Sequence, residues 1–267
     1  MTAVASATLT TPWLAAPAVA APCPDAEVVF ARGTTEDPGV GPTGQAFVDA
    51  LRARVGPKSV GTYAVDYPAT MAFSTAVQGI ADARAHILST AAACPTTKMV
   101  LGGFSQGAAV MGFVTASVVP EGVSPDEVPA PMPPEVADHV AAVVLVGKPS
   151  TRFMNVLKDP DIVVGPNYAT KSLELCADND LVCDPHGRGF AVHSQYSELG
   201  LVDQGATFAA QKLQAAWAAE ALAEGTGPLP GPDPAGALAA PDQVAHSGTA
   251  PVLPGPAPVA QPVSDPA

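Results

Sequence analysis

Basic residues are scarce in this chain of 267 residues, and the shortage limits the partners it can have. Lysine and arginine together number 12, against 25 aspartate and glutamate residues, which gives a formal charge of −13 at pH 7. Phosphate backbones and anionic membrane surfaces repel a chain with this excess of negative charge. We therefore expect no nucleic-acid partner.

Long apolar runs are also missing. Prolines at positions 12, 17 and 22 interrupt the one candidate, residues 1–22, before it reaches the roughly 20 apolar residues that a membrane-spanning helix needs. The segment nevertheless ends in Ala-x-Ala patterns, as the later half of a secretory signal does, although no lysine or arginine precedes Arg32. The sequence predicts a secretory signal-like segment over residues 1–22, with a disordered leader as the alternative, and no transmembrane segment.

Cysteines are few, and none stands in a close Cys-x-x-Cys pair of the kind found in zinc sites and thioredoxin-like motifs. We therefore expect no metal site. The even number, 4, favours two disulfides, which need an oxidising compartment. The predicted location is outside the cell or in the cell envelope.

What the chain does contain is an alternation of strand and helix patterns between residues 23 and 222. β-rich or continuously apolar runs predict strands at residues 27–31, 60–65, 99–103, 140–146 and 168–175. Helical spacing predicts helices at residues 45–55, 74–92 with Ser74 as the N-cap, 108–115 and 203–222. Such alternation predicts one α/β domain, with a mostly parallel five-stranded sheet between two layers of helices.

Two further segments interrupt or follow this pattern. Residues 119–138 are rich in proline and acidic residues, so we expect a surface loop, which could overhang a site at the neighbouring strand ends. Residues 223–267 are rich in proline, alanine and glycine and contain few large apolar residues. They cannot bury enough surface to offset their loss of conformational entropy, and we expect a disordered tail.

A chemically informative motif, Gly103-Phe104-Ser105-Gln106-Gly107, lies between the third predicted strand and the helix that follows it. A serine on such a tight strand-to-helix turn is typical of a nucleophile elbow, in which flanking glycines relieve backbone crowding. The first N–H groups of the helix would face an oxyanion formed beside the serine. The alternative is a chance pattern in a turn, but the flanking elements favour acyl transfer at Ser105.

A nucleophilic serine needs a base and a carboxylate that orients the base, and in this kind of fold the chain order is Ser, Asp, His. Residues 176–193 supply three aspartates, at positions 178, 180 and 184, and two histidines, at positions 186 and 193. Their positions alone do not choose among them. Of the remaining histidines, those at positions 86 and 139 precede the aspartates and the one at position 246 lies in the tail, and we expect all three to be solvated.

Four separated blocks narrow the choice. They are Phe30 to Glu36, Gly103 to Gly107, Cys176-x-x-x-Asp180-Leu181-Val182-Cys183, and His193 ten residues later. In this order they resemble the cutinase family, most closely its secreted actinobacterial cutinase-like serine esterases. The resemblance covers roughly residues 23–217 and implies an α/β-hydrolase-type three-layer sandwich.

The resemblance also implies roles for individual residues. Ser105 matches the family's nucleophile, Asp180 its acid and His193 its base. The oxyanion hole would consist of the backbone N–H of Gln106 and the hydroxyl of Thr34, where fungal members carry serine. The cysteines would pair as Cys23–Cys94 and Cys176–Cys183.

The predicted function is that of a secreted, monomeric serine esterase, without cofactor or metal. It would hydrolyse carboxylic esters with short to medium acyl chains through an acyl-enzyme, with cutin-like polyesters or lipids as further candidate substrates. Two alternatives remain open. One is an acyltransferase or phospholipase on the same scaffold, and the other is a non-catalytic secreted protein that binds lipid or polymer.

Overall fold

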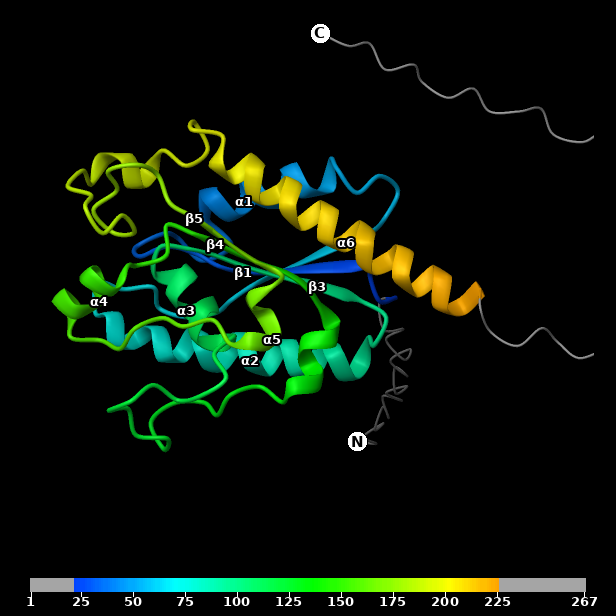
Figure 1. Ribbon diagram of the computed structural model, residues 1–267, viewed down its shortest axis with the longest axis horizontal. Coiled ribbons are helices and arrows are strands. Elements are labelled where there is room, and N and C mark those ends of the chain that lie inside the picture. Colours follow the sequence, from blue (N-terminus) through cyan, green and yellow to red (C-terminus); the bar gives the residue numbers. More distant parts are fainter. Residues whose placement is uncertain (1–21, 226–267) are drawn as a thin grey trace, which may run out of the picture. The chain divides into compact units, whose positions relative to one another are not determined.

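The computed structural model describes residues 22–225, and a five-stranded sheet lies at its centre (Figure 1). The strands are β1 (Ala26–Ala31), β2 (Val60–Ala64), β3 (Lys98–Phe104), β4 (Val140–Val146) and β5 (Ser172–Leu175). All of them are parallel, in the order β2-β1-β3-β4-β5. Their carboxyl ends therefore share one edge of the sheet, and the loops that follow them meet there.

Helices cover both faces of the sheet (Figure 1). On one face lie α1 (Gly41–Arg52) and α6 (Leu201–Gly225), and on the other α2 (Ala76–Ala93), α3 (Gln106–Val114) and the short α5 (Pro166–Ala169). A further helix, α4 (Thr151–Leu157), follows β4, and three 3₁₀ turns are η1 (Phe73–Thr75), η2 (Pro134–His139) and η3 (Ala191–Ser194). This three-layer arrangement confirms the predicted fold class.

The central strand β4 shows why the apolar pattern is continuous rather than alternating. All of its residues are buried, since both faces are covered. Val144 packs into the core beneath α1 and α6, whereas Val143 and Leu145 belong to the core beneath α2 and α3. Burial on two sides requires an apolar residue at every position, and the predicted bounds 140–146 are therefore correct.

Several element boundaries differ from the sequence predictions. The helices predicted at residues 45–55 and 108–115 are Gly41–Arg52 and Gln106–Val114. Ser74 lies within η1 and does not cap α2, which begins after Thr75 without a side-chain cap. The fifth strand is only Ser172–Leu175, because Pro166 begins a turn of helix that includes Tyr168. At the other end of the chain α6 continues to Gly225, past the predicted boundary at residue 222.

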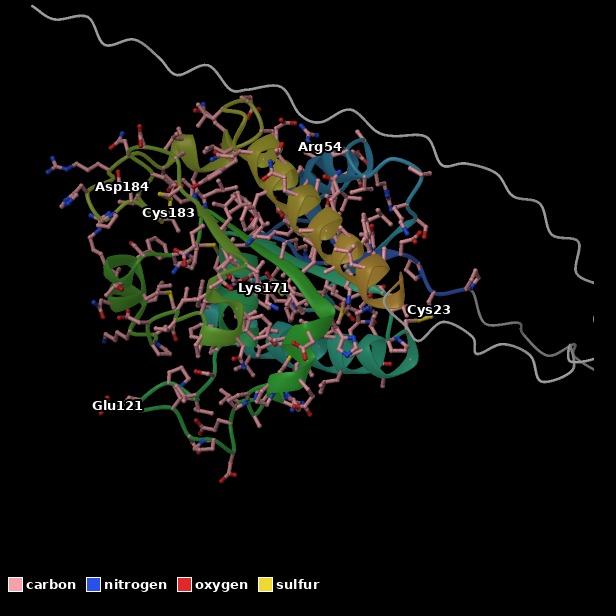
Figure 2. All side chains as sticks on the ribbon, turned by 45° about the vertical axis from the view of Figure 1, so that its right-hand side comes forward. Cys23, Arg54, Glu121, Lys171, Cys183 and Asp184 are labelled. Atoms are coloured by element: carbon pink, nitrogen blue, oxygen red, sulfur yellow. A yellow bond between two sulfur atoms is a disulfide. The ribbon has the colours of Figure 1, made fainter. Side chains whose placement is uncertain are left out.

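The two disulfides are Cys23–Cys94 and Cys176–Cys183, the pairing that the resemblance implies. They lie at opposite ends of the sheet, as the positions of Cys23 and Cys183 in Figure 2 show. The first joins the chain before β1 to the end of α2, and the second closes a small ring after β5.

Several predictions fall on other parts of the chain. The signal-like segment, apart from residue 22, and the tail from residue 226 onward, with His246, lie outside the described residues. Within residues 22–225, no helix is long and apolar enough to cross a membrane.

Candidate active site

Ser105 occupies the turn between β3 and α3 in a strained backbone conformation, with φ 54° and ψ −117°. Its backbone N–H donates to Val146 O at 2.9 Å, which ties the turn to β4. A Cβ atom on Gly103 would lie 2.2 Å from Gly107 O, and one on Gly107 would lie 2.0 Å from Ala31 O. The turn lies so close to the neighbouring backbone that only glycine fits at these two positions.

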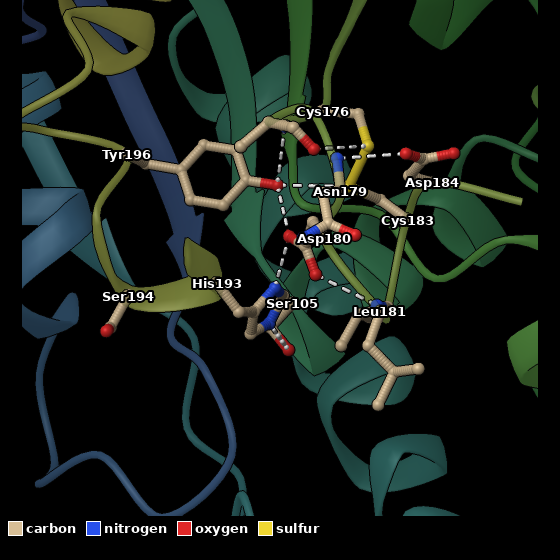
Figure 3. A network of polar contacts seen from close by, with 12 residues as sticks. Ser105, Cys176, Asn179, Asp180, Leu181, Cys183, Asp184, His193, Ser194 and Tyr196 are labelled. Carbon is tan, nitrogen blue, oxygen red and sulfur yellow. Dashed lines mark hydrogen bonds and ion pairs between the residues drawn. A yellow bond between two sulfur atoms is a disulfide. The ribbon is translucent and has the colours of Figure 1, made fainter. Parts of the chain in front are cut away.

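His193, on η3, faces this serine across the carboxyl edge of the sheet (Figure 3). Its Nε2 lies 2.8 Å from Ser105 Oγ. The imidazole is 7% exposed and stacks on Phe104, with ring centroids 5.0 Å apart. On another side, a Cβ atom on Gly147 would lie 3.0 Å from His193 Cε1. The ring is therefore confined by its neighbours, with one nitrogen directed at the serine.

Asp180 lies on the other side of the imidazole and is fully buried. Its Oδ2 lies 2.7 Å from His193 Nδ1 and accepts a hydrogen bond from Tyr196 Oη, also at 2.7 Å. Its Oδ1 accepts from the backbone N–H of Val182 at 2.8 Å. Burial alone would raise the pKa of this carboxyl, but the bonds from His193, Tyr196 and Val182 outweigh burial and hold the pKa below its ordinary value.

The charge state of Asp180 decides how the two histidine nitrogens share their protons. An ionised carboxylate only accepts hydrogen bonds, so Nδ1 of His193 must donate to it. In the neutral imidazole, Nε2 is then the nitrogen without a proton, and it can accept the hydroxyl hydrogen of Ser105. A continuous chain of hydrogen bonds thus runs from the serine to the buried carboxylate.

The other candidates from the same segment are placed differently. Asp178 and His186 are exposed. Asp184 accepts backbone N–H groups, from Asn179 at 2.9 Å and from His186 at 2.8 Å, so its carboxylate shapes the local turn. The structure therefore brings Asp180 and His193 to Ser105 and leaves these three side chains out of the arrangement.

The loop after β1, which carries Thr34, is fixed by the nearly buried side chain of Arg32. The guanidinium of Arg32 donates to Tyr67 O at 2.5 Å and to Glu36 O at 2.9 Å, and Tyr67 Oη donates back to Arg32 O at 2.5 Å. Glu36 Oε2 accepts from the backbone N–H of Gly33 at 2.6 Å. Burial raises the pKa of Glu36, while the Gly33 bond opposes this shift. This network holds the loop in one shape.

The resemblance assigns an oxyanion hole to Thr34, in this loop, and to Gln106, at the start of α3. Thr34 is half-buried in the loop. Gln106 is the first residue of α3, so its backbone N–H has no carbonyl partner within the helix. The Gln106 side chain is fully buried and donates to Thr70 O at 3.0 Å. Close contact of Gly107 with Ala31 O packs the start of α3 directly against the loop of Thr34.

Tyr196 is a residue of this site that the sequence did not single out. Its side chain is 1% exposed, and Figure 3 shows its hydroxyl directed at Asp180. The one feature of the sequence that could have pointed to Tyr196 is its position three residues after His193, which keeps the two side chains close together. A tyrosine in a polar stretch has no other mark of burial in the sequence.

His86 corrects a prediction about the remaining histidines. It is half-buried rather than solvated, with Nε2 2.9 Å from Glu27 Oε2 and its ring stacked on Tyr63 at a centroid separation of 3.5 Å. The cluster joins α2 to the first two strands. Among the described residues, no group of three histidine, cysteine, aspartate or glutamate side chains is placed to hold a metal ion.

Comparison with known proteins gives consistent matches. The family model described as Cutinase matches residues 22–213. The chain is 58% identical to a probable carboxylesterase, Culp5 of Mycobacterium tuberculosis, over 62% of this chain and 95% of that protein. It is 45% identical to the phospholipase Culp4 of the same organism, over 79% of this chain and 88% of that protein.

A solved structure supports the same relationship. The Trichoderma reesei cutinase in complex with a phosphonate inhibitor is 28% identical, with a TM-score of 0.54 over 72% of this chain and 78% of that one. The family match covers most of the chain, and the sheet, the elbow and both disulfides fall within it. The chain therefore belongs to the cutinase family and is a carboxylic ester hydrolase.

Proposed function

We propose that the chain is a secreted serine esterase in which Ser105 is the nucleophile, His193 the general base and Asp180 the residue that orients the base. The observation that carries the proposal is the unbroken hydrogen-bond chain from Ser105 Oγ through the imidazole to the buried carboxylate. Nε2 of His193 lies within reach of the serine proton, and Nδ1 of the same ring lies against the carboxylate that orients it.

In the first step the Ser105 hydroxyl attacks the ester carbonyl carbon while His193 Nε2 takes the hydroxyl proton. The imidazolium that forms lies against Asp180, whose buried negative charge stabilises it. Collapse of the tetrahedral intermediate breaks the bond to the alcohol oxygen, and Nε2 returns the proton to that oxygen. The products are a free alcohol and an acyl group on Ser105.

Charge develops on the carbonyl oxygen during this attack. We propose that the backbone N–H of Gln106 and the hydroxyl of Thr34 donate to it, since hydrogen-bond donors directed at the developing charge stabilise such an intermediate. Support comes from the free N–H at the start of α3 and from the network around Arg32, which fixes the Thr34 loop before substrate arrives. Donors held in advance need no reorganisation when charge forms.

In the second step water replaces the alcohol. His193 Nε2 removes a proton from the water as the oxygen attacks the acyl carbonyl, and the acid is released when Ser105 regains its proton. The same base thus serves both halves of the reaction, and no cofactor takes part in the proposed steps.

The proposed substrates are carboxylic esters of short to medium acyl chains, including lipid or polyester substrates. Phe190 supports an apolar component, because it is 65% exposed and its ring centroid lies 5.7 Å from that of His193. A second candidate activity is phospholipid cleavage, since a relative at 45% identity is named a phospholipase. Transfer of the acyl group to an alcohol would use the same acyl-enzyme.

We also propose that the catalytic domain spans residues 23–222 and acts as a monomer outside the cytosol. The two disulfides support this location, because cytosolic thiols are kept reduced.

Labelling with a fluorophosphonate, together with hydrolysis of p-nitrophenyl esters of increasing chain length, tests the proposal. Wild type should be labelled and should hydrolyse the esters, whereas Ser105→Ala should do neither and should unfold at the wild-type temperature. Ser197→Ala, which removes an exposed hydroxyl, is the matched control and should behave as wild type. Turnover by Ser105→Ala close to that of wild type would remove Ser105 as nucleophile. A wild type that is neither labelled nor active would favour the non-catalytic binding protein.

A further inference from the structure

A cavity lies on the face of the sheet that α2 and α3 cover, beside the proline-rich loop between α3 and η2 (residues 116–133). Its volume is about 340 Å³, and its walls include Val77 and Ile80 of α2, Phe113 of α3, and Val123 and Val128 of the loop. The lining includes neither the three proposed triad residues nor the two proposed oxyanion donors. The proline-rich loop therefore lines a cavity in which none of these five residues takes part.

The cavity and the serine are connected through α3 but lie apart. Phe113 comes eight residues after Ser105, which corresponds to about 12 Å along the helix axis. Figure 2 shows Glu121, in the proline-rich loop, well away from Cys183 and Asp184, which lie between Asp180 and His193 in the chain. A ligand in this cavity would therefore bind at a site separate from Ser105.

The walls of the cavity are mainly apolar. Ser74, Glu127 and Asp159 are the lining residues with polar side chains, and the rest are alanine, valine, isoleucine, phenylalanine and proline. A water molecule needs two to four polar partners, so mainly apolar walls favour an apolar ligand over water. The volume of the cavity equals that of about eleven water molecules at about 30 Å³ each, which leaves room for a hydrocarbon chain of medium length.

The ionisable groups that line the cavity all carry the same sign of charge. The ionisable lining side chains, Glu127 and Asp159, are both carboxyls, and no lysine, arginine or histidine lines the described cavity. Burial raises the pKa of Asp159, as expected for a carboxyl against apolar walls. The carboxylate of a fatty acid would meet like charge here, but an uncharged head group would not.

The proline-rich loop contains backbone hydrogen bonds between its own residues. Within it, Val123 N–H donates to Pro120 O at 3.2 Å and Glu127 N–H to Ser124 O at 3.0 Å, so these bonds are local and survive if the loop moves as a unit. Met132, 9% exposed, packs into the core at the end of the loop and provides an apolar anchor.

We propose that this cavity binds the hydrocarbon chain of a neutral amphiphile, such as a long-chain alcohol or an uncharged ester, at a site distinct from the catalytic serine. The inference does not depend on the proposed catalytic mechanism, because binding can be measured in a chain that lacks the nucleophile. It gives the protein a means of holding neutral chains while rejecting the anionic acids that ester hydrolysis releases.

The test uses the full chain with Ser105→Ala and an uncharged fluorophore, N-phenyl-1-naphthylamine, that brightens in apolar sites. At pH 7.5, 1-decanol should displace the fluorophore at concentrations at least tenfold lower than decanoate. Adding Ala116→Trp, which fills the cavity from its wall, should weaken fluorophore binding at least tenfold. The matched control Ala85→Trp, at an exposed position of α2, should leave binding unchanged.

Two further variants make the outcome decisive. If Ala116→Trp does not fold, Val123→Trp fills the cavity from the loop. The double variant Glu127→Gln with Asp159→Asn should strengthen decanoate binding at least threefold and leave decanol binding unchanged. Equal displacement by decanol and decanoate in the parent chain would overturn the proposed selectivity, and unchanged binding in the filled variants would overturn the site.

Discussion

Tyr196 Oη and His193 Nδ1 contact the same atom, Oδ2 of Asp180, each at 2.7 Å. The carboxylate oxygen that orients the proposed base is therefore itself oriented by a phenol. Tyr196 is held in turn, because its hydroxyl accepts the backbone N–H of Ala177 at 3.2 Å and lies 3.1 Å from Cys183 Sγ. Burial and the bond to Asp180 raise the pKa of this phenol, so it remains a donor.

Tyr196→Phe should reduce kcat about tenfold and change KM little, because a hydrogen bond to a buried charged group is worth about 1.5–3 kcal/mol. Steady-state kinetics with a short p-nitrophenyl ester measures the effect. Tyr168→Phe is the matched control: the buried Tyr168 Oη has no hydrogen-bond partner within the described residues, and its removal should leave kcat unchanged.

Tyr196→Phe should also change how the stability of the fold depends on pH. The folded-state pKa of Asp180 is lowered, so its contribution to stability is present above the unfolded pKa near 3.8 and is lost as pH falls through the folded pKa. Removing the Tyr196 bond makes this shift smaller. The loss of melting temperature below about pH 4 should therefore be shallower in Tyr196→Phe than in Tyr168→Phe, and parallel curves would show that Tyr196 acts only through packing.

The two histidines of residues 176–193 should differ sharply in their effect on kcat. His193→Ala removes the proposed base and should lower kcat by at least about a thousandfold, whereas His186→Ala removes an exposed side chain and should retain most activity. Kinetics of both variants at a temperature where circular dichroism shows them folded provides the measurement. The reverse pattern would exclude the triad proposed here.

How far the sequence could predict this site depends on what each residue contacts. Ser105 carries its own signal, because the elbow needs glycine on both sides and a strand and a helix around it. The choices of Asp180 and His193 required the family resemblance, since Asp178 and His186 have the same chemistry a few positions away. Only the folded chain shows which of them faces the serine.

The wrong predictions have causes that can be traced to particular residues. Tyr168 suits a strand by composition, but Pro166 begins a helical turn there. His86 looks like a surface residue of an amphipathic helix, yet its partner Glu27 comes from a strand 59 positions away. Tyr196 was missed for the same reason, because burial by distant segments leaves no periodic mark in the sequence.

Phe190 should affect chain-length preference. Phe190→Ser removes an exposed aromatic surface beside His193, so kcat/KM for an octanoate ester should fall by up to about tenfold while that for an acetate ester changes less than twofold. Val163→Ser, at a position equally exposed at 65%, is the matched control and should leave both values unchanged. An equal loss for both esters in Phe190→Ser would place the residue in support of His193 and not in substrate selection.

Asp25 should contribute stability in a defined pH range. Its carboxylate bonds Lys58 Nζ at 2.7 Å and the backbone N–H of Ser59 at 2.8 Å, and the contacts to Lys58 and Ser59 lower its pKa to about 2. This contribution is fully present above the unfolded pKa near 3.8 and disappears as pH falls to about 2. Asp25→Asn should therefore melt below wild type at pH 6 and together with it at pH 2.

A matched variant separates this effect from net charge. Asp178→Asn removes the same charge from an exposed position and should melt close to wild type at both pH values. If Asp25→Asn and Asp178→Asn behave alike at pH 6, the contacts of Asp25 make no specific contribution.

The two disulfides should have different roles. Cys23–Cys94 spans a sequence separation of 71, and closing such a loop is worth about 4.4 kcal/mol in the chain-entropy model. Cys176–Cys183 spans a separation of only 7, worth about 2.5 kcal/mol by the same estimate, but its ring contains Asp180. The first bond should mainly stabilise the fold, and the second should mainly position the carboxylate.

Double replacement by serine distinguishes these roles. A catalytic group displaced by about 1 Å can cost about a hundredfold in rate, so Cys176→Ser with Cys183→Ser should lower kcat far more than its modest loss of melting temperature suggests. Cys23→Ser with Cys94→Ser should show the opposite pattern, a large loss of melting temperature with kcat close to wild type, because that bond lies at the other end of the sheet. Kinetics at a temperature where both variants are folded decides the matter, and equal kcat values would mean that the small ring does not position Asp180.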